Sequence, residues 1–322
     1  MIRLTGVEVL RLWSRRLLRV VGALVLLLVC VIVAIDGYQH AKDTTGEVAE
    51  FNEQRLAGYE EARAQFEQDQ EAGRIPADAS FPTREEAEAE PFICFPEPSS
   101  ADTFDCNPPR FPYVVTQQLP DFSRAVAVIC AIAAFLIGAS AAGAEWAAGT
   151  MQALLFWEPR RVRVVIAKVV GLVTVVAVLV IAAQAVFTGA ALLAGTLRGT
   201  TAGLTADVWI SHLLLVTRAI GIAAFAAVLG FSIAFGARVT AAAVGVGFIY
   251  FAVLEQLLVA WKAWLANYLI GPLLAGWLNY GFDEEFGGEL SLSGQRAGIT
   301  LAVYALVILF VATLWFRQRD VT

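Results

Sequence analysis

The residues most able to do chemistry lie in one mixed stretch between two long apolar segments, GAEWAAGTMQALLFWEPRR at positions 143–161. One carboxylate, Glu145, precedes mostly apolar residues, a second, Glu158, follows them, and a pair of arginines follows Pro159. This mixture predicts a short helix over 143–158, with its tryptophans at the depth of lipid headgroups and proline as its stop. By itself, Glu145 is an ordinary solvated carboxylate, and the alternative for the whole stretch is a membrane-surface helix without function.

A second candidate is Glu255, which lies in an otherwise apolar segment at 239–262. A carboxylate inside a membrane is costly and suggests a functional site. It lies about 24 Å along the predicted helix at 1.5 Å per residue. We expect Glu255 to pair with Arg218 or Lys262, or to face a water-filled cavity where it contacts substrate or takes part in gating.

Several chemistries are absent from the sequence. The chain has no G-x-x-x-x-G-K-[ST] segment for nucleotide phosphates and no H-E-x-x-H or His/Cys/Asp cluster for a metal. An intramembrane serine hydrolase would need Ser140 as nucleophile within hydrogen-bond reach of His212. The two residues lie on opposite sides of the predicted membrane, about one bilayer thickness apart. We therefore expect no catalytic residue, cofactor or metal site in this chain.

The elements that position these residues are long apolar helices. Of the 322 residues, 58% are hydrophobic and 16% are charged, against about 45–50% and 25% in soluble domains. The apolar runs predict an all-α integral membrane protein with six spans, at 17–35, 122–142, 163–190, 208–235, 239–262 and 297–316. A cleaved signal peptide is the alternative for the first span, but no small-residue cleavage site precedes Asp36.

Basic residues mark one side of the predicted membrane. Arginines precede the first span, and others lie between the second and third, between the fourth and fifth, and after the sixth. If the chain crosses the membrane six times, all these basic flanks lie on the same side of it. The positive-inside rule places that side, together with both termini, in the cytoplasm. The stretch 1–19 predicts an amphipathic helix on the inner membrane surface; the alternative is a frayed basic tail.

An acidic insert at 36–121 separates an N-terminal region, 1–35, from spans two to six in 122–322. The insert contains 19 of the 29 acidic residues and only 6 of the 23 basic ones. Helices are predicted over 44–72 and over 84–90, the second opened by a capping box from Thr83 to Glu86. Cys94 and Cys106 predict a disulfide in an oxidising compartment outside the cell, with two free thiols as the alternative.

These features together resemble the bacterial type-2 ABC-transporter permeases. The resemblance is carried by G-A-Glu145-Trp146-x-x-Gly149-Thr150, by Leu154-Leu155, by Pro159-Arg160-Arg161 and by Ala167-Lys168. The run FIYFAVLE that ends at Glu255 and the basic exit from the last span, WFRQRDV, are also similar to the family. The insert is much longer than the first external loop of the family, so substrate and regulation are open.

The resemblance implies a subunit that does not hydrolyse ATP itself. In the family, the stretch after the second span is the coupling helix, which docks on an ABC ATPase subunit that binds ATP and Mg. The coupling residues it implies here are Glu145, Trp146, Gly149, Thr150, Leu154, Arg160 and Arg161. Glu145 would pair with a basic residue of the ATPase. A second permease copy or a related chain completes the pathway in the plasma membrane of a bacterium.

Two other functions compete with ATP-driven export. The first alternative is a non-transporting membrane anchor or assembly factor that acts through its external domain, which predicts stability without an ATPase. A secondary transporter is the third option, but the sequence shows no inverted repeat and one clear intramembrane carboxylate. No sequence feature indicates nucleic-acid binding or identifies a transported substrate.

Overall fold

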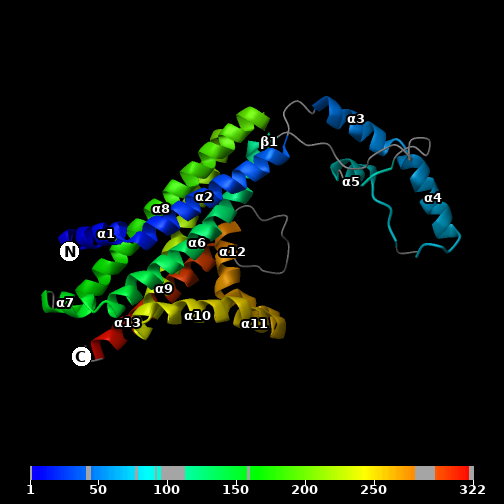
Figure 1. The fold of residues 1–322 in the computed structure, drawn as a ribbon. Helices are drawn as coiled ribbons and strands as arrows, with labels where there is room; N and C mark the ends of the chain where they lie inside the picture. Colours follow the sequence, from blue (N-terminus) through cyan, green and yellow to red (C-terminus); the bar gives the residue numbers. More distant parts are fainter. Residues whose placement is uncertain are drawn as a thin grey trace. The chain divides into compact units, whose positions relative to one another are not determined.

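The computed structural model describes residues 2–40, 45–76, 79–90, 93–95, 113–157, 160–279 and 294–318. Nearly all of this part of the chain is helical, and its two strands are two residues long (Figure 1). The predicted all-α fold is confirmed. Six helical segments are long and apolar enough to cross a membrane: α2 (Arg16–Gln39), α6 (Val115–Ala147), α8 (Arg161–Arg198), α9 (Ala206–Ala237), α10 to α11 (Thr240–Trp261) and α13 (Gly294–Gln318).

The six spans lie on the six predicted segments, and most are longer than predicted. The apolar runs identify the part of each helix that suits a bilayer, but a helix continues through its polar ends as long as its backbone bonds are made. The 38 residues of α8 reach about 57 Å, nearly twice the hydrocarbon thickness of about 30 Å. The ends of α8 therefore extend beyond the apolar layer, where charged residues are tolerated.

Shorter elements connect and extend the spans. Before the insert lies α1 (Ile2–Ser14), and after the second span lies α7 (Thr150–Trp157). The fifth span consists of α10 (Thr240–Ile249), a π-helical turn η1 (Tyr250–Leu254) and α11 (Glu255–Trp261). After it lie two short helices, the 3₁₀ helix η2 (Ala263–Tyr268) and α12 (Ile270–Asn279). The insert contains α3 (Thr45–Leu56), α4 (Tyr59–Glu71), α5 (Arg84–Ala89) and β1 (Tyr113–Val114).

The chain divides into two compact units. The membrane unit comprises Met1–Val33, Thr116–Ala190 and Gly203–Thr322, and the insert unit comprises Ala34–Val115 with Ala191–Ala202. The sequence suggests one continuous insert, 36–121, whereas the structure adds the second segment. The reason is a parallel pairing of β1 with β2 (Gly199–Thr200), in which Tyr113 lies opposite Gly199. A side chain at Gly199 would collide with the backbone of Tyr113.

Three helices form the core of the membrane unit. Between 56% and 72% of the apolar window is buried in α6, α8 and α9, but only 17% to 22% in the other three spans. Glycines bring α6 and α9 into backbone contact: Gly138 lies against the carbonyl of Ala227, and Gly230 lies against that of Phe135. The glycines of α6 and α9 therefore allow these two helices to pack closely.

A buried polar network also joins the three core helices. Ser123 on α6 donates to the side-chain oxygen of Gln184 on α8 (2.9 Å), whose amide nitrogen donates back to the Ser123 carbonyl (3.0 Å). One turn further along α8, the Thr188 hydroxyl lies 2.9 Å from Nε2 of His212 on α9. These bonds fix the register of the three helices, because sliding one would leave buried polar groups unpaired.

The C-terminal spans pack on the core through a second apolar cluster. Phe225 and Leu229 of α9, Leu273 of α12, and Ala297 and Leu301 of α13 are all buried against one another. Trp277 of α12 donates its indole N–H to the Arg218 carbonyl on α9 (3.2 Å). The short helix α12 thus contacts both α9 and α13 and helps to hold α13 against the core.

The helix predicted over 44–72 is two helices, because the chain breaks at Ala57–Gly58. Gly58 donates its N–H to the Phe95 carbonyl (2.6 Å), and the Phe95 N–H donates to the Arg55 carbonyl (2.5 Å). These long-range backbone bonds replace the helical ones at the break. Shortly after the end of α4, Gly73 takes the left-handed conformation, with φ +70°, which glycine adopts without steric cost.

The second predicted insert helix is confirmed as α5, with its capping box complete. Thr83 Oγ1 accepts from the Glu86 N–H (3.3 Å), and the Glu86 carboxylate accepts from the Thr83 N–H (2.8 Å). These two bonds lower the pKa of the Glu86 carboxyl from its ordinary value. The predicted Cys94–Cys106 disulfide stays a prediction, because Cys106 lies outside the described residues.

Candidate functional site

The predicted interfacial helix does not begin at Gly143. Residues 143–147 are the last turns of α6, and the short helix α7 begins only at Thr150. The turn between them closes with the Gly149 N–H donating to the Trp146 carbonyl (3.1 Å). Gly149 has φ +67°, a left-handed conformation that glycine adopts without steric cost. The residue pattern did not predict this break, because the residues on both sides of it are typical of helices.

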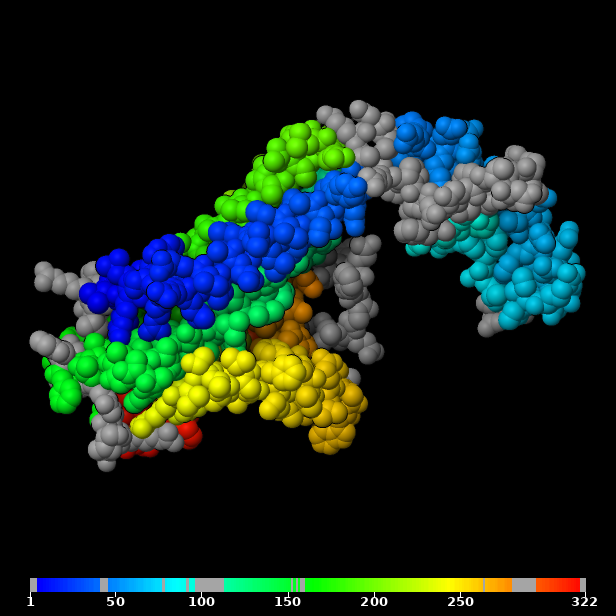
Figure 2. Space-filling view, in the orientation of Figure 1, coloured from blue at the N-terminus to red at the C-terminus, as the bar shows by residue number. Residues whose placement is uncertain are grey.

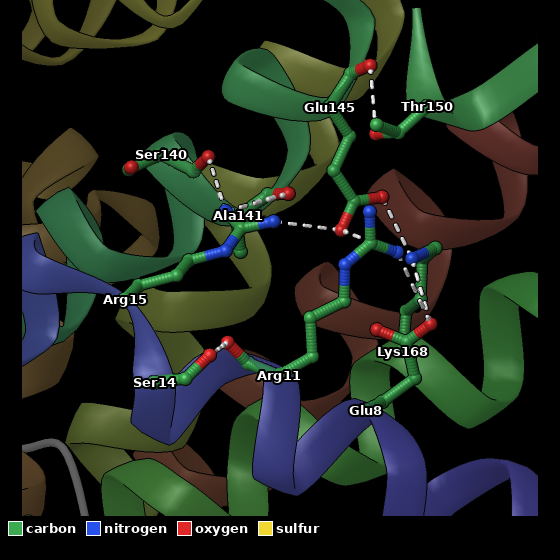
Figure 3. Close-up of polar contacts among 9 residues, drawn as sticks. All are labelled: Glu8, Arg11, Ser14, Arg15, Ser140, Ala141, Glu145, Thr150 and Lys168. Atoms are coloured by element: carbon green, nitrogen blue, oxygen red, sulfur yellow. Dashed lines mark hydrogen bonds and ion pairs between the residues drawn. The ribbon is translucent and has the colours of Figure 1, made fainter. Parts of the chain in front are cut away.

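The carboxylate of Glu145 is buried among cations of its own chain (Figure 3). One oxygen lies 2.8 Å from Arg15 Nη2 and 3.7 Å from Arg11 Nη1, and the other lies 2.7 Å from Lys168 Nζ. The side chain of Glu145 is only 5% exposed. The expectation that this carboxylate is free to pair with a partner protein is therefore wrong, since both oxygens are occupied internally.

A second carboxylate completes this group of charges. Glu8 of α1 lies 3.0 Å from Lys168 Nζ and 4.0 Å from Arg11 Nη1. Two acids and three bases thus meet where three helices converge, and we call them the charged cluster: Glu8, Arg11, Arg15, Glu145 and Lys168. Removing one member of a buried ion pair costs about 3–5 kcal/mol, because the other charge stays buried without compensation.

The charged cluster forms because α1 lies close against α8. Glu8, Arg11 and Arg15 are spaced by three and four residues, which places them on one side of the N-terminal helix. Gly171 of α8 allows the approach: a Cβ there would lie 3.2 Å from the Cβ of Glu8. Arg15 also donates to the Ser140 carbonyl of α6 (3.1 Å). The cluster therefore ties α1, α6 and α8 together at one end of the core.

An aromatic cluster ties the same end of α6 to the last helices. The Trp146 ring lies 6.0 Å from each of Phe235 and Phe316, which are 4.8 Å apart. The Arg238 guanidinium lies 4.6 Å above the Trp146 ring, within cation–π range. Arg161 donates to the Phe316 carbonyl (2.9 Å). Trp146 and Arg161 are half-buried, and their contacts hold α6, α8, α9 and α13 together.

The helix α7 has an anchored side and an exposed side. Met151 is 1% exposed, whereas Phe156 is 89% exposed. Thr150 donates its hydroxyl to the Glu145 carbonyl across the turn (3.3 Å), which fixes the start of α7 to the end of α6. Leu154 is half-buried, and Arg160 is exposed directly before α8. An aromatic ring so exposed next to an exposed arginine suits a protein interface.

The structure thus sorts the predicted coupling residues into two groups. Glu145 is buried, and Trp146 and Arg161 are half-buried against other helices of the chain, while Arg160 is exposed before α8 and Leu154 is half-buried on α7. Sequence reasoning missed the cations that pair with Glu145, because Arg15 is 130 positions away. It also missed Phe156 as a site residue. The available signal was its position in a short helix, five residues from Met151 and so roughly on the opposite face.

The second predicted site, Glu255, is buried but not paired with a cation. Its carboxylate accepts from the backbone N–H of Gly271 (3.2 Å), and a side chain at Gly271 would collide with it. Among the described residues, no ion pair joins Glu255 to Arg218 or Lys262. Lys262 Nζ instead lies 5.1 Å from the Trp261 ring. Through this hydrogen bond Glu255 fixes the first turn of α12. Its role toward a substrate stays a prediction.

Comparison with known proteins identifies one family. The family described as ABC-2 family transporter protein matches residues 12–321, which is nearly the whole chain. The match includes α7, the aromatic cluster and three of the five charged-cluster residues, Arg15, Glu145 and Lys168. No curated protein sequence matches this chain.

Proposed function

Because the chain belongs to the ABC-2 transporter family, we propose that it is the membrane-spanning permease subunit of an ATP-driven exporter. In this proposal, a partner ABC ATPase binds ATP and Mg and pushes on α7, and the movement opens and closes a path between the spans. The chain itself carries no phosphate-binding Gly-rich loop. Its part in the reaction is mechanical, and none of its residues is assigned a catalytic role.

The observation that carries this proposal is the way α7 is attached. Its outer side presents Phe156, and its inner side is held by buried Met151 and by the two-residue turn at Gly149. A push on the exposed ring therefore reaches the end of α6 through a short, bonded connection. An exposed aromatic anchor that enters a pocket of a partner is the usual centre of binding energy in an interface.

In this proposal the charged cluster transmits the movement of α7 to other helices. It bonds the end of α6 to α1 and α8, and the aromatic cluster bonds it to α9 and α13. A displacement of α7 would therefore move several helices as a group instead of bending one. In this proposal Glu145, Trp146 and Arg161 are positioning residues, whereas Leu154, Phe156 and Arg160 face the ATPase.

A second permease chain is part of the proposal. The spans α2, α10 to α11 and α13 leave most of their apolar windows unburied within one copy, which leaves room for a related subunit beside the lipid. The N-terminal helix, α7 and the end of α13 lie at the same end of the membrane unit (Figure 1). We place this end in the cytoplasm of a bacterial cell and the insert outside.

The test uses the complete transporter in inverted membrane vesicles, with Phe156→Asp as the variant. A second variant, Phe156→Ala, removes the ring without adding charge. Its matched control is Phe310→Ala, which removes an exposed phenylalanine from α13. An aspartate at 310 is not used, because it would place a charge in lipid. We expect Phe156→Ala to weaken ATPase binding about 30-fold, the size of an interface hot spot, and Phe156→Asp to abolish transport. Phe310→Ala should leave both unchanged.

Two results would contradict the proposal. If Phe156→Asp binds the ATPase and transports like the wild type, α7 is not the docking element. If no ATPase copurifies and the chain is stable and active without one, the non-transporting membrane anchor becomes the better explanation. Arg160→Glu tests the contribution of charge at the same surface. It should weaken binding of the ATPase more at low salt than at high salt, because salt screens the interaction between exposed charges.

A further inference from the structure

An apolar groove of about 200 Å³ lies between α2 and α8 of the membrane unit. Figure 2 shows α1 and α2 in blue, forming a ridge beside the green surface of the core helices. The groove is lined by Gly22, Ala23 and Leu26 of α2 and by Val175, Val178 and Ala182 of α8. Trp13 and Arg19 lie at one end of it.

Small side chains explain why the groove is hollow. At Gly22 the two helices approach closely, since a Cβ there would lie 3.4 Å from a methyl carbon of Leu179. Ala23 and Ala182 beside this point carry only methyl groups, so the space next to the contact stays unfilled. From Arg19 to Leu26 the groove follows α2 for about 10 Å at helical rise.

The surroundings define what fills this space. Both walls belong to helices that are apolar enough to cross a membrane, so the groove faces hydrocarbon rather than water. An unfilled groove would cost its lining atoms their dispersion contacts. An acyl chain is the available molecule that is long, narrow and apolar enough to lie along two adjacent spans.

The polar end of the groove favours a negatively charged headgroup. Arg19 is exposed, and its guanidinium donates to the Ser14 carbonyl (3.4 Å) with other N–H groups left for a further acceptor. Arginine binds phosphate oxygens in a bidentate manner. Trp13 is 55% exposed beside it, and tryptophan rings favour headgroup depth. Val7 and Leu10 extend this exposed apolar face along α1.

We propose that this groove is a binding site for an anionic phospholipid, with one acyl chain between α2 and α8 and the phosphate on Arg19. Trp13 and Arg19 flank the break between α1 and α2. The bound lipid therefore braces the helix that contributes Glu8 to the charged cluster. The site depends only on the spans and the groove, so it stands or falls separately from the docking of an ATPase on α7.

The experiment is native mass spectrometry of the full chain in detergent. Phosphatidylglycerol or phosphatidylcholine with identical acyl chains is added, and the fraction of protein with one bound lipid is measured. Wild type should prefer phosphatidylglycerol about fivefold, the effect of one basic residue near an anionic lipid. Arg19→Gln should reduce this preference to near one, while Arg198→Gln, at the far end of α8, should keep it.

A second pair of variants tests the acyl chain. Ala182→Phe fills the groove and should reduce the binding of both lipids, whereas Ala185→Phe, exposed on the same helix outside the groove, should not. Equal binding of both lipids by wild type would overturn the headgroup assignment. Unchanged binding by Ala182→Phe, with both phenylalanine variants monodisperse, would show that the acyl chain lies elsewhere and would overturn the site.

Discussion

The protein buries charge in two regions, and it compensates the charge differently in each. In the insert unit, Arg55 is 1% exposed and makes five hydrogen bonds. Four of them go to backbone carbonyls, at 2.6 Å to Ala87, 2.7 Å to Ile93, 3.0 Å to Glu88 and 3.1 Å to Glu90. In the membrane unit, the charged cluster instead sets two carboxylates against three cations.

The difference shows what each arrangement can do. The carbonyls around Arg55 come from one short segment, so this arginine staples α3 to the chain around α5. Burial lowers the pKa of its guanidinium from the ordinary value, with the Glu88 carboxylate opposing the shift, and the group stays charged in any case. The charged cluster connects three helices that are distant in sequence, whereas Arg55 connects α3 to one short segment around α5.

The largest effect is expected from Lys168→Met. Lys168 Nζ lies 2.7 Å from Glu145 and 3.0 Å from Glu8, so its loss removes the nearest cation of both carboxylates and leaves buried Glu8 with only the 4.0 Å contact to Arg11. We expect a loss of about 3–5 kcal/mol, measured as a lower midpoint of thermal unfolding in nanodiscs. The double variant Lys168→Met/Glu8→Gln should recover part of it. Equal midpoints for wild type and Lys168→Met would show that the cluster is not a single electrostatic unit.

The next effect is expected from Arg55→Lys, which keeps the charge of the insert staple. A lysine has one nitrogen and three donors, so at least one of the four carbonyls is left without its bond. We expect a loss of about 1–3 kcal/mol, seen as faster amide hydrogen exchange in α3 and α5. Exchange in α6 and α8 is the internal control. Acceleration there as well would mean that the staple is not local.

A smaller effect is expected from Arg15→Lys, the same substitution in the charged cluster. Here the ion pair with Glu145 carries most of the interaction, and a lysine retains it while losing the bonds to the Ser140 and Ala141 carbonyls. We expect about 1 kcal/mol or less, from the same thermal measurement. Destabilisation larger than that of Arg55→Lys would reverse the contrast between carbonyl-compensated and ion-paired arginines.

The smallest effect is expected from acid. The pKa of Glu86 is lowered in the folded insert from an ordinary value of 4.5, so the capping box stabilises α5 above that pH. Its contribution is lost as pH falls through the folded-state pKa, which should lower the hydrogen-exchange protection factors of α5 first, once exchange rates are corrected for their intrinsic pH dependence. Glu86→Gln should flatten this pH dependence. An unchanged profile in that variant would remove Glu86 as the cause.

Much of the architecture was predictable from local patterns. Six apolar runs were enough to locate the six spans, because a bilayer demands about 20 apolar residues in each. The capping box at Thr83 and Glu86 located α5 by a rule that depends on residues three apart. The break at Gly58 was not predictable, because the bonds that replace the helix come from Phe95, far along an irregular segment.

The candidate site was predictable in place but not in its contacts. The stretch after the second span was identified, yet Glu145 was expected at the surface and is buried against Arg15 and Lys168. The sequence by itself determined where apolar length suffices to cross lipid and that the short-range capping box of α5 forms. Only the tertiary structure decided which charges meet, because Coulombic pairing depends on distance in space, and Gly171 lets α1 bring its charges within reach of residues more than 100 positions away.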